Sequence, residues 1–300
     1  MRPSLSRGLS AALIVITLAG CATRSAPPQR QAQRPSPPGG GYVDVGLAGQ
    51  ASAFEAYTRR AAAIDPSFAD PAEIGQRLRT AAGYEPRQLE AGMIAYAALA
   101  AMQEPGFVAA VRANRDVARR VAADPNAALG LPGATAAAAR ANAALARRGE
   151  ALAAAGQRVR KASYSVQHQA WSRARISGPA AAERLAAVKQ AAGYRADPAD
   201  RARLSAAIAE GGRRGGASPV VARGVAVAAL TVLGQDGAAR SLMQEPRSGQ
   251  CLRIAKLNYH QCLAAAGTHY EDIYCLGLHA MADPGRCVVE ATRPARRAGL

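Results

Sequence analysis

The sequence predicts an all-α fold, an array or bundle of antiparallel alanine-rich helices with a disulfide-stapled helical hairpin at the C-terminal end. Three observations lead to this prediction. From about residue 50 to residue 282, apolar residues recur at spacings of three and four, the period of an amphipathic helix. Helix breakers interrupt the pattern at intervals that suit individual helices. No segment of this body alternates apolar and polar residues, as a half-buried strand does, for longer than residues 42–45.

The composition narrows the class of protein. The chain has 300 residues, of which 49% are hydrophobic but only 4% are aromatic, so alanine supplies most of the apolar share. A chain of this length suits one or two domains and can bury a core, and its apolar fraction excludes full disorder. No uninterrupted apolar run reaches the roughly 18 residues of a membrane-spanning helix, which excludes a polytopic membrane protein.

The chain is strongly basic, with 38 lysine and arginine residues, 21 aspartate and glutamate residues, and a formal net charge of +17. Nearly all of the cations are arginines. They occur as pairs scattered along the chain, whereas a surface for single-stranded nucleic acid gathers its cations among aromatic residues. We therefore do not expect a nucleic-acid partner.

Residues 1–20 have the three parts of a secretory signal peptide. Arg2 and Arg7 form a positive region, residues 11–18 are apolar apart from Thr17, and small residues precede the expected cleavage point. We expect this segment to be removed, so it takes no part in the mature fold.

The four residues Leu18-Ala19-Gly20-Cys21 resemble the lipobox of bacterial lipoproteins. The resemblance covers only the first two dozen residues. It implies that the Cys21 thiol is acylated and becomes the new N-terminus, and several acyl chains anchor a protein stably in a membrane. Ala22 in place of aspartate implies the outer membrane, with the protein on its periplasmic face. The alternative is an ordinary secreted protein with a chance cysteine beside the cleavage site.

Residues 21–41 form a tether in this interpretation. They are rich in proline, glutamine and glycine and have no apolar periodicity. At about 3.1 Å per residue for polyproline-like chain, they span up to roughly 60 Å from the bilayer. We divide the remainder into an alanine-rich helical domain over residues 42–248, a cysteine-stapled hairpin over 249–292 and a basic tail over 293–300.

Helix start and stop signals divide the body into its elements. The dipeptide Asp-Pro recurs, and at Asp70 and Asp197 it predicts a helix start. The aspartate side chain can accept the free N–H groups of the first turn, and proline at the first helical position needs no donor. The expected helices cover residues 50–64, 71–82, 87–102, 107–122, 134–175, 179–192, 198–210, 219–233, 236–243, 251–266 and 269–282.

The segment 134–175 is expected to be one long helix. It has no proline and little glycine, and it is rich in residues that favour helices. At 1.5 Å per residue it spans roughly 60 Å. We interpret it as an internal spine, because it lacks the sustained apolar heptad of a partner-binding coiled coil.

Four cysteines lie beyond Cys21, and an even number in an exported chain predicts two disulfides. Gly267 is a helix stop, and Thr268 with Glu271 forms a capping-box pattern immediately after it. These signals predict a very short link between antiparallel helices over 251–266 and 269–282.

The geometry of this hairpin decides the cysteine pairing. Counting outward from the link, Cys262 and Cys275 lie within about 3 Å of the same height. Cys251 and Cys287 are near the same height at the open end, although Cys287 follows a break expected at residues 283–285. The crossed pairings need offsets of roughly 13 and 21 Å, beyond the reach of a disulfide. We predict nested disulfides, Cys251–Cys287 and Cys262–Cys275.

The alternative use of these cysteines is a metal or haem site with His260, His269 or His279. The sequence has no C-x2-C or C-x2-C-H spacing to support it. We expect no metal and no cofactor, and we interpret the histidines as surface groups.

No catalytic motif is recognisable in the sequence, and we name no catalytic residue. The patterns G-x-S-x-G, S-x-x-K, H-E-x-x-H, the Walker motif and the dinucleotide fingerprint are all absent. His168 lies near Trp171 on the long helix, but no nucleophile is apparent nearby, so we interpret both as packing or surface residues. A glycosidase-like pair of carboxylates remains open, because its members need not be close in sequence.

The sequence GGRRGG at residues 211–216 is a candidate anion-binding element. Flexible glycines around Arg213 and Arg214 could let the two guanidinium groups hold a phosphate or carboxylate bidentately. The simpler interpretation is a solvated loop that joins two helices.

Two functional hypotheses follow. The first is a non-enzymatic module of the cell envelope, a lipid-anchored basic helical body that binds an envelope protein or an anionic cell-wall polymer. The second is an envelope enzyme that acts on cell-wall material through an unidentified carboxylate site. The first is favoured, because the recognisable features of the sequence concern anchoring and stapling.

Overall fold

Helices account for nearly all of the regular structure in the computed structural model of the chain, which describes residues 46–210 and 212–294. Over these residues, the one pairing of extended backbone is an isolated antiparallel bridge between Arg175 and Thr268. The predicted all-α fold is confirmed.

Fourteen α-helices, a 3₁₀-helix (η1) and a π-helix (η2) make up the described part of the chain, and many begin with proline, which needs no donor in a first turn. Their bounds are α1 Leu47–Ala62, α2 Pro71–Ala82, α3 Pro86–Ala101, α4 Pro105–Ala113, α5 Val117–Ala123, η1 Pro125–Gly130, α6 Ala134–Val166, α7 Ala170–Arg173, α8 Pro179–Gln190, α9 Pro198–Ala209, α10 Pro219–Val232, α11 Asp236–Ser241, α12 Pro246–Ala265, α13 His269–Cys275, η2 Leu276–Ala282 and α14 Asp283–Ala291.

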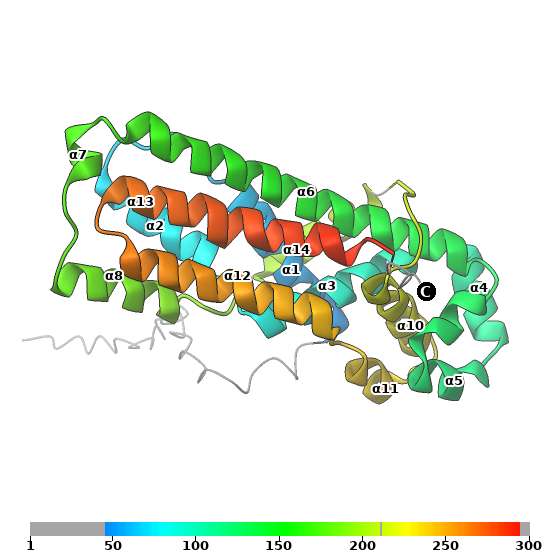
Figure 1. Cartoon of the computed structure of the whole chain (residues 1–300). Helices are drawn as coiled ribbons and strands as arrows, with labels where there is room; N and C mark the ends of the chain where they lie inside the picture. The colour runs from blue at the N-terminus through cyan, green and yellow to red at the C-terminus, as the bar shows by residue number, and fades with distance from the viewer. Residues whose placement is uncertain (1–45, 211, 295–300) are drawn as a thin grey trace, which may run out of the picture. The chain divides into compact units, whose positions relative to one another are not determined.

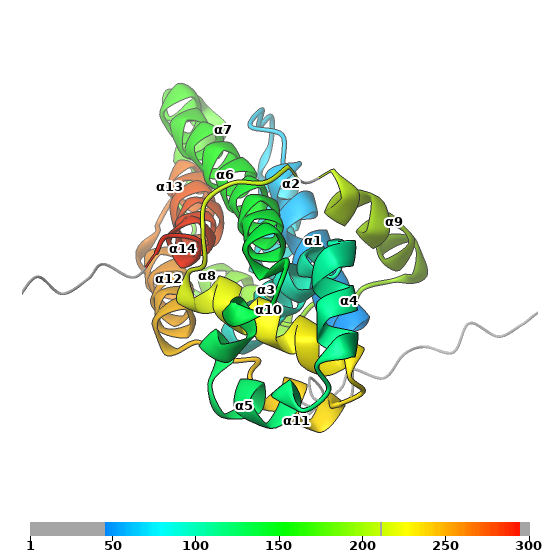
Figure 2. The same ribbon diagram turned by 90° about the vertical axis from the view of Figure 1, so that its right-hand side faces the viewer.

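The long helix α6 runs along the body, and α13, η2 and α14 form a continuous helical rod beside it (Figure 1). Helix α12 is the partner of this rod in the hairpin, and α1 and α3 also pack against α6. Helices α3 and α10 pack against each other, and both are buried over most of their surface because they are apolar nearly all round. Figure 2 views the same arrangement nearly end-on to α6.

Two of the expected helices are shorter than the sequence predicts. The segment 107–122 is divided between α4 and α5, because the Asn114 side chain donates to a carbonyl of its own last turn, at 2.7 Å, and competes with helix continuation. The segment 134–175 is helical as α6 only to Val166. Beyond that residue, the Ser172 hydroxyl and the N–H of Gln169 donate to the Val166 carbonyl, which ends the helix.

The break expected at residues 283–285 was wrong, because the helix continues through Pro284 to Ala291. Proline lacks an N–H and its ring crowds the carbonyl of the preceding turn in an α-helix. Here the preceding turn is the π-helix η2, whose wider i to i+5 hydrogen-bonding pattern accommodates the proline at the start of α14.

Four glycines bring α6 into direct backbone contact with the η2–α14 rod. A Cβ atom on Gly156 would lie 2.4 Å from the backbone nitrogen of Ala282, and one on Gly277 would lie 2.3 Å from that of Arg160. About two turns further along, a Cβ atom on Gly149 or Gly285 would likewise lie 2.9 or 2.5 Å from backbone atoms of the facing helix. Because no side chain fits between these backbones, the backbones of the rod and of α6 are in direct contact along this stretch.

The local signals for helix starts are confirmed at Asp70 and Asp197. Asp70 accepts two N–H groups of α2 at 2.8 and 3.1 Å, and Asp197 forms a complete capping box with the third residue of α9. The capping box predicted at Thr268 is only half formed. Glu271 reaches back to the N–H of Gly267 at 2.7 Å, but the Thr268 hydroxyl donates to Glu271 and does not cap the helix.

Both disulfides occur in the predicted nested pairing. Cys262 and Cys275 join α12 to α13 near the link, with a Cα–Cα distance of 5.6 Å, and Cys251 and Cys287 join α12 to α14 at the open end, at 5.7 Å. Cys251 and Cys287 lie at the same height because the helix continues through residues 283–285. The C-terminal hairpin is therefore stapled at both ends.

Among the described residues, no single helix is both long and apolar enough to cross a bilayer. Helices α3 and α4, which meet at a bend of 92°, reach that threshold only when they are counted together.

Candidate functional site

Several carboxylates of the body are held by arginines of the same chain. Glu55 on α1 is 1% exposed and pairs at 3.1 Å with both Arg59 and Arg148. Asp200 on α9 is fully buried and pairs with Arg59 at 2.7 Å and with Arg60 at 3.0 Å. Removing one partner of such a buried pair leaves an uncompensated charge, so this network holds α1, α6 and α9 together.

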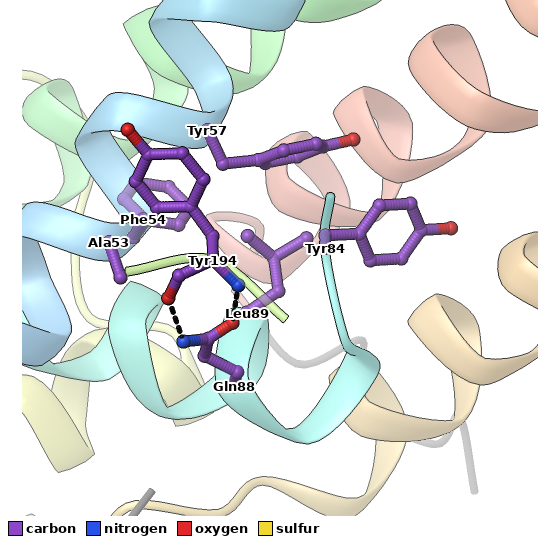
Figure 3. A pocket seen from close by; sticks show the side chains of 7 residues that line it. All are labelled: Ala53, Phe54, Tyr57, Tyr84, Gln88, Leu89 and Tyr194. Atoms are coloured by element: carbon purple, nitrogen blue, oxygen red, sulfur yellow. Dashed lines mark hydrogen bonds between the residues drawn. The ribbon is translucent and has the colours of Figure 1, made fainter. Parts of the chain in front are cut away.

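Tyr194 connects the network to a small cavity between α1 and α3 (Figure 3). The Tyr194 hydroxyl donates to Asp200 at 2.6 Å, and the Tyr194 backbone is held by the side-chain amide of Gln88. Burial raises the pKa of Asp200, but hydrogen bonds from Tyr194 and the Asp197 N–H, with the nearby Arg60, outweigh burial and hold this pKa below its ordinary value. The cavity has a volume of about 10 Å³, room for about one water molecule, and it is too small to hold a substrate.

The two arginines of the GGRRGG loop bind carboxylates of the chain itself. Arg213 donates to both oxygens of Glu104, at 2.8 and 2.9 Å, and Arg214 pairs with Glu150 of α6 at 2.5 Å. The hydrogen bond from Arg213, against burial and together with Arg140, holds the pKa of Glu104 below its ordinary value. The bidentate geometry expected of this loop thus occurs, with an intramolecular carboxylate as the anion.

Two carboxylates of the described residues have the raised pKa expected of a general acid. Burial raises the pKa of Asp272 to about 7, but Arg184 pairs with it at 2.7 Å. The other carboxylate is Glu90. Burial is the main cause that raises its pKa, and the side chain is 3% exposed. However, helix α12 covers it closely, because a Cβ on Gly249 would lie 2.6 Å from a Glu90 carboxylate oxygen. No substrate can reach a group covered in this way.

The histidines do not assemble a metal centre in the described part of the chain, where no group of three or more His, Cys, Asp or Glu side chains could hold a metal ion. His279 pairs with Asp283 at 2.7 Å, one turn along the rod. His168 lies in the turn between α6 and α7, Trp171 lies in α7, and the Trp171 indole donates to Gln169. The structure therefore does not bring these candidates into one catalytic arrangement.

The second half of α6 and the segment that follows it carry several exposed cations. Helix α7 and the end of α6 lie at one end of the body (Figure 1). Arg158 and Lys161 lie on the outer side of α6, and between this pair and the end of the helix Tyr164 is 50% exposed, with its ring edge-on to Tyr274 at 6.3 Å. No ion pair within the described residues engages any of these cations. We call the set the cationic face: Arg158, Lys161, Tyr164, His168, Arg173 and Arg175.

The cationic face has no neutralising carboxylate close to it in the sequence. Residues 151–182 contain five lysine and arginine residues and no aspartate or glutamate. The acidic residues of neighbouring α13 are already engaged, since Glu271 binds the Gly267 N–H and Asp272 pairs with Arg184 at 2.7 Å. This charge imbalance is visible in the sequence and could have indicated the face. Among the predicted sites, only the GGRRGG motif was a candidate for anion binding.

Compared with protein-family models, curated proteins and solved structures, the chain has no significant match to any of them. Cys21, the predicted lipidation site, lies outside the described residues, as do the signal peptide, the tether and the end of the basic tail.

Proposed function

We propose that this protein is a non-enzymatic binding module of the bacterial cell envelope. It is held at the periplasmic face of the outer membrane through lipidated Cys21, and it binds an anionic cell-wall polymer through its cationic face. The resemblance to the lipobox supports the anchor, and the proline-rich segment up to residue 41 supplies the reach.

The single observation that supports the binding role is the distribution of charge. Several arginines elsewhere in the body neutralise buried carboxylates, as at Glu55, Asp200 and Glu104. The cations of the cationic face have no such partner and all are exposed. A concentrated charge of one sign attracts and orients a polymer of the opposite sign.

The length of the face favours a polymer over a single small anion. From Arg158 to Val166, where α6 ends, the helix advances eight residues, or roughly 12 Å at 1.5 Å per residue, and the rest of the face follows this helix. One small anion contacts only part of such a stripe, whereas a polymer with repeated carboxylates contacts all of it. Each exposed contact contributes only a few tenths of a kcal/mol, so binding depends on several contacts acting together.

Co-sedimentation with purified cell-wall sacculi tests the proposal. The chain with Cys21→Ser, exported without a lipid anchor, should pellet with sacculi at low salt and remain soluble at 1 M salt, where the screening length falls to about 3 Å. Replacing Arg158, Lys161, Arg173 and Arg175 together with glutamine should lower the affinity about tenfold.

A matched variant separates the cationic face from net charge. Arg112, Arg115, Arg119 and Arg120 are also exposed and belong to α4, α5 and the turn between them, so replacing all four with glutamine removes the same total charge elsewhere. This control should pellet like the parent protein. Equal loss in both variants would show that net charge alone drives binding, and release of soluble wall fragments by the parent would contradict a non-enzymatic role.

The anchor has its own test. In membrane fractionation the unaltered protein should sediment with the outer membrane, and Cys21→Ser should appear in the periplasm. An unchanged distribution of Cys21→Ser would contradict lipidation at this residue.

A further inference from the structure

A second cavity, of about 340 Å³, lies where the first turns of α10 and α12 meet the end of α14. Its volume falls in the range of roughly 300–1,000 Å³ that is usual for small-molecule sites. It is separate from the cationic face, which belongs to α6, α7 and the segment after α7.

The walls of this cavity are partly apolar and are held at a defined separation. Pro219 at the start of α10 and Pro294 after α14 are exposed and contribute apolar surface, whereas Val220 and Ala291 are almost fully buried. The disulfide between Cys251 and Cys287 also lines the cavity and joins α12 to α14 across it. Because a covalent bond links these two walls, the cavity keeps its width without a ligand.

The polar side of the cavity presents guanidinium groups. Arg247 is exposed and forms no ion pair within the described residues. Glu245 also lines the cavity but forms no ion pair with Arg247. This residue is 7% exposed, and its carboxylate accepts the backbone N–H groups of Arg247 and Ser248 and the Ser248 hydroxyl, at 3.3, 2.8 and 2.8 Å. These bonds also occupy the free N–H groups at the start of α12. The donors available to a ligand in this cavity are therefore arginine side chains and not the N–H groups of the helix end.

Arg293 is a second donor that an anion can recruit. It pairs with Glu290, which also lines the cavity, three residues earlier, but the two side chains are 61% and 57% exposed. An exposed pair of this kind contributes about 0–1 kcal/mol, so a ligand anion that also contacts Arg247 can compete for it.

We propose that this cavity binds a small amphiphilic anion. Its carboxylate or phosphate group contacts Arg247 and Arg293, and its apolar portion lies against Pro219, Pro294 and the disulfide. The site is independent of polymer binding by the cationic face.

Isothermal titration calorimetry of the Cys21→Ser chain tests the site with octanoate and octyl phosphate as probes and octylamine as the charge-reversed control. At least one of the two anions should bind saturably at one site, and octylamine should not. The tighter of the two anions identifies the head group. No saturable binding of either anion, or equal binding of octylamine, would overturn the proposal.

Arg247→Gln should weaken binding of the anion about tenfold, because one charge-assisted contact is lost. Arg240→Gln removes an exposed arginine of α11 outside the cavity and should bind as the parent does. If Arg247→Gln fails to fold, Arg293→Gln provides the same test. Unchanged affinity in the folded variant would refute the site, whereas pelleting with sacculi should be unaffected by either substitution.

Discussion

Replacing Gly156 with alanine is expected to destabilise the protein, although the same replacement usually stabilises a helix. The added Cβ would lie 2.4 Å from the backbone nitrogen of Ala282 and 2.6 Å from the carbonyl oxygen of Gly277. Ordinary Cβ contacts begin near 3.4 Å, so α6 and the η2–α14 rod must separate by about 1 Å.

The magnitude follows from two opposing contributions. Helix propensity favours alanine over glycine by about 1 kcal/mol. Overpacking costs typically about 1–3 kcal/mol, and here the upper end applies, because both close atoms belong to backbone that no rotamer change can move. The net loss in the free energy of unfolding is about 2 kcal/mol, which corresponds to a fall of about 4–8 °C in Tm for a chain of this size.

Urea unfolding and thermal melts, both followed by far-UV circular dichroism, measure this loss. Gly75→Ala is the matched control, because Gly75 lies inside α2 and its Cβ would meet only the end of the Arg79 side chain, at 3.6 Å. The control should be stabilised by up to about 1 kcal/mol. A Gly156→Ala protein as stable as the parent would refute the direct backbone contact between α6 and the rod.

Three further predictions concern the disulfide, a buried lysine and the GGRRGG loop. Serine at both Cys251 and Cys287 should lower the free energy of unfolding by about 4 kcal/mol, because this disulfide closes a loop of 36 residues, and an unchanged urea midpoint would contradict it. Burial lowers the pKa of Lys256 to about 8 from 10.5, so between these values the unfolded chain binds more protons and stability should rise with pH by up to about 1.4 kcal/mol per unit. Lys256→Met should lose this rise in melts above about pH 8, and an identical slope in both proteins would count against the assignment. Glu104→Gln should release Arg213 and speed trypsin cleavage at that residue, whereas an unchanged digestion rate would show that the pair does not hold the loop.

The helix caps and the cysteine pairing could be predicted from the sequence, because each depends on interactions between residues that are close along the chain. A cap such as Asp70 or Asp197 is a property of four consecutive residues, so it is visible in the sequence. The nested cysteine pairing was also predictable, because a short link between two helices sets which positions lie at the same height.

The predicted helix ends were wrong where a side chain bonded to the backbone or where a turn had an unusual hydrogen-bonding pattern. Asn114 and Ser172 end helices by hydrogen bonds to backbone carbonyls, and nothing in the helix-favouring composition around them indicated this. Pro284 looked like a helix stop, but the π-helical turn before it lets the rod continue.

The sequence by itself determined the helical class, the main helix starts, the pairing of the four C-terminal cysteines and the excess of positive charge, because each depends on neighbouring residues or on composition. Only the tertiary structure decided which cations are neutralised. Arg213 and Arg214 are paired with Glu104 and Glu150, which are 109 and 64 residues away, while the cations of the cationic face have no such partner. An ion pair depends on which distant segments meet, and a linear sequence does not state that. The same holds for the glycines between α6 and the rod, whose role exists only because two helices approach there.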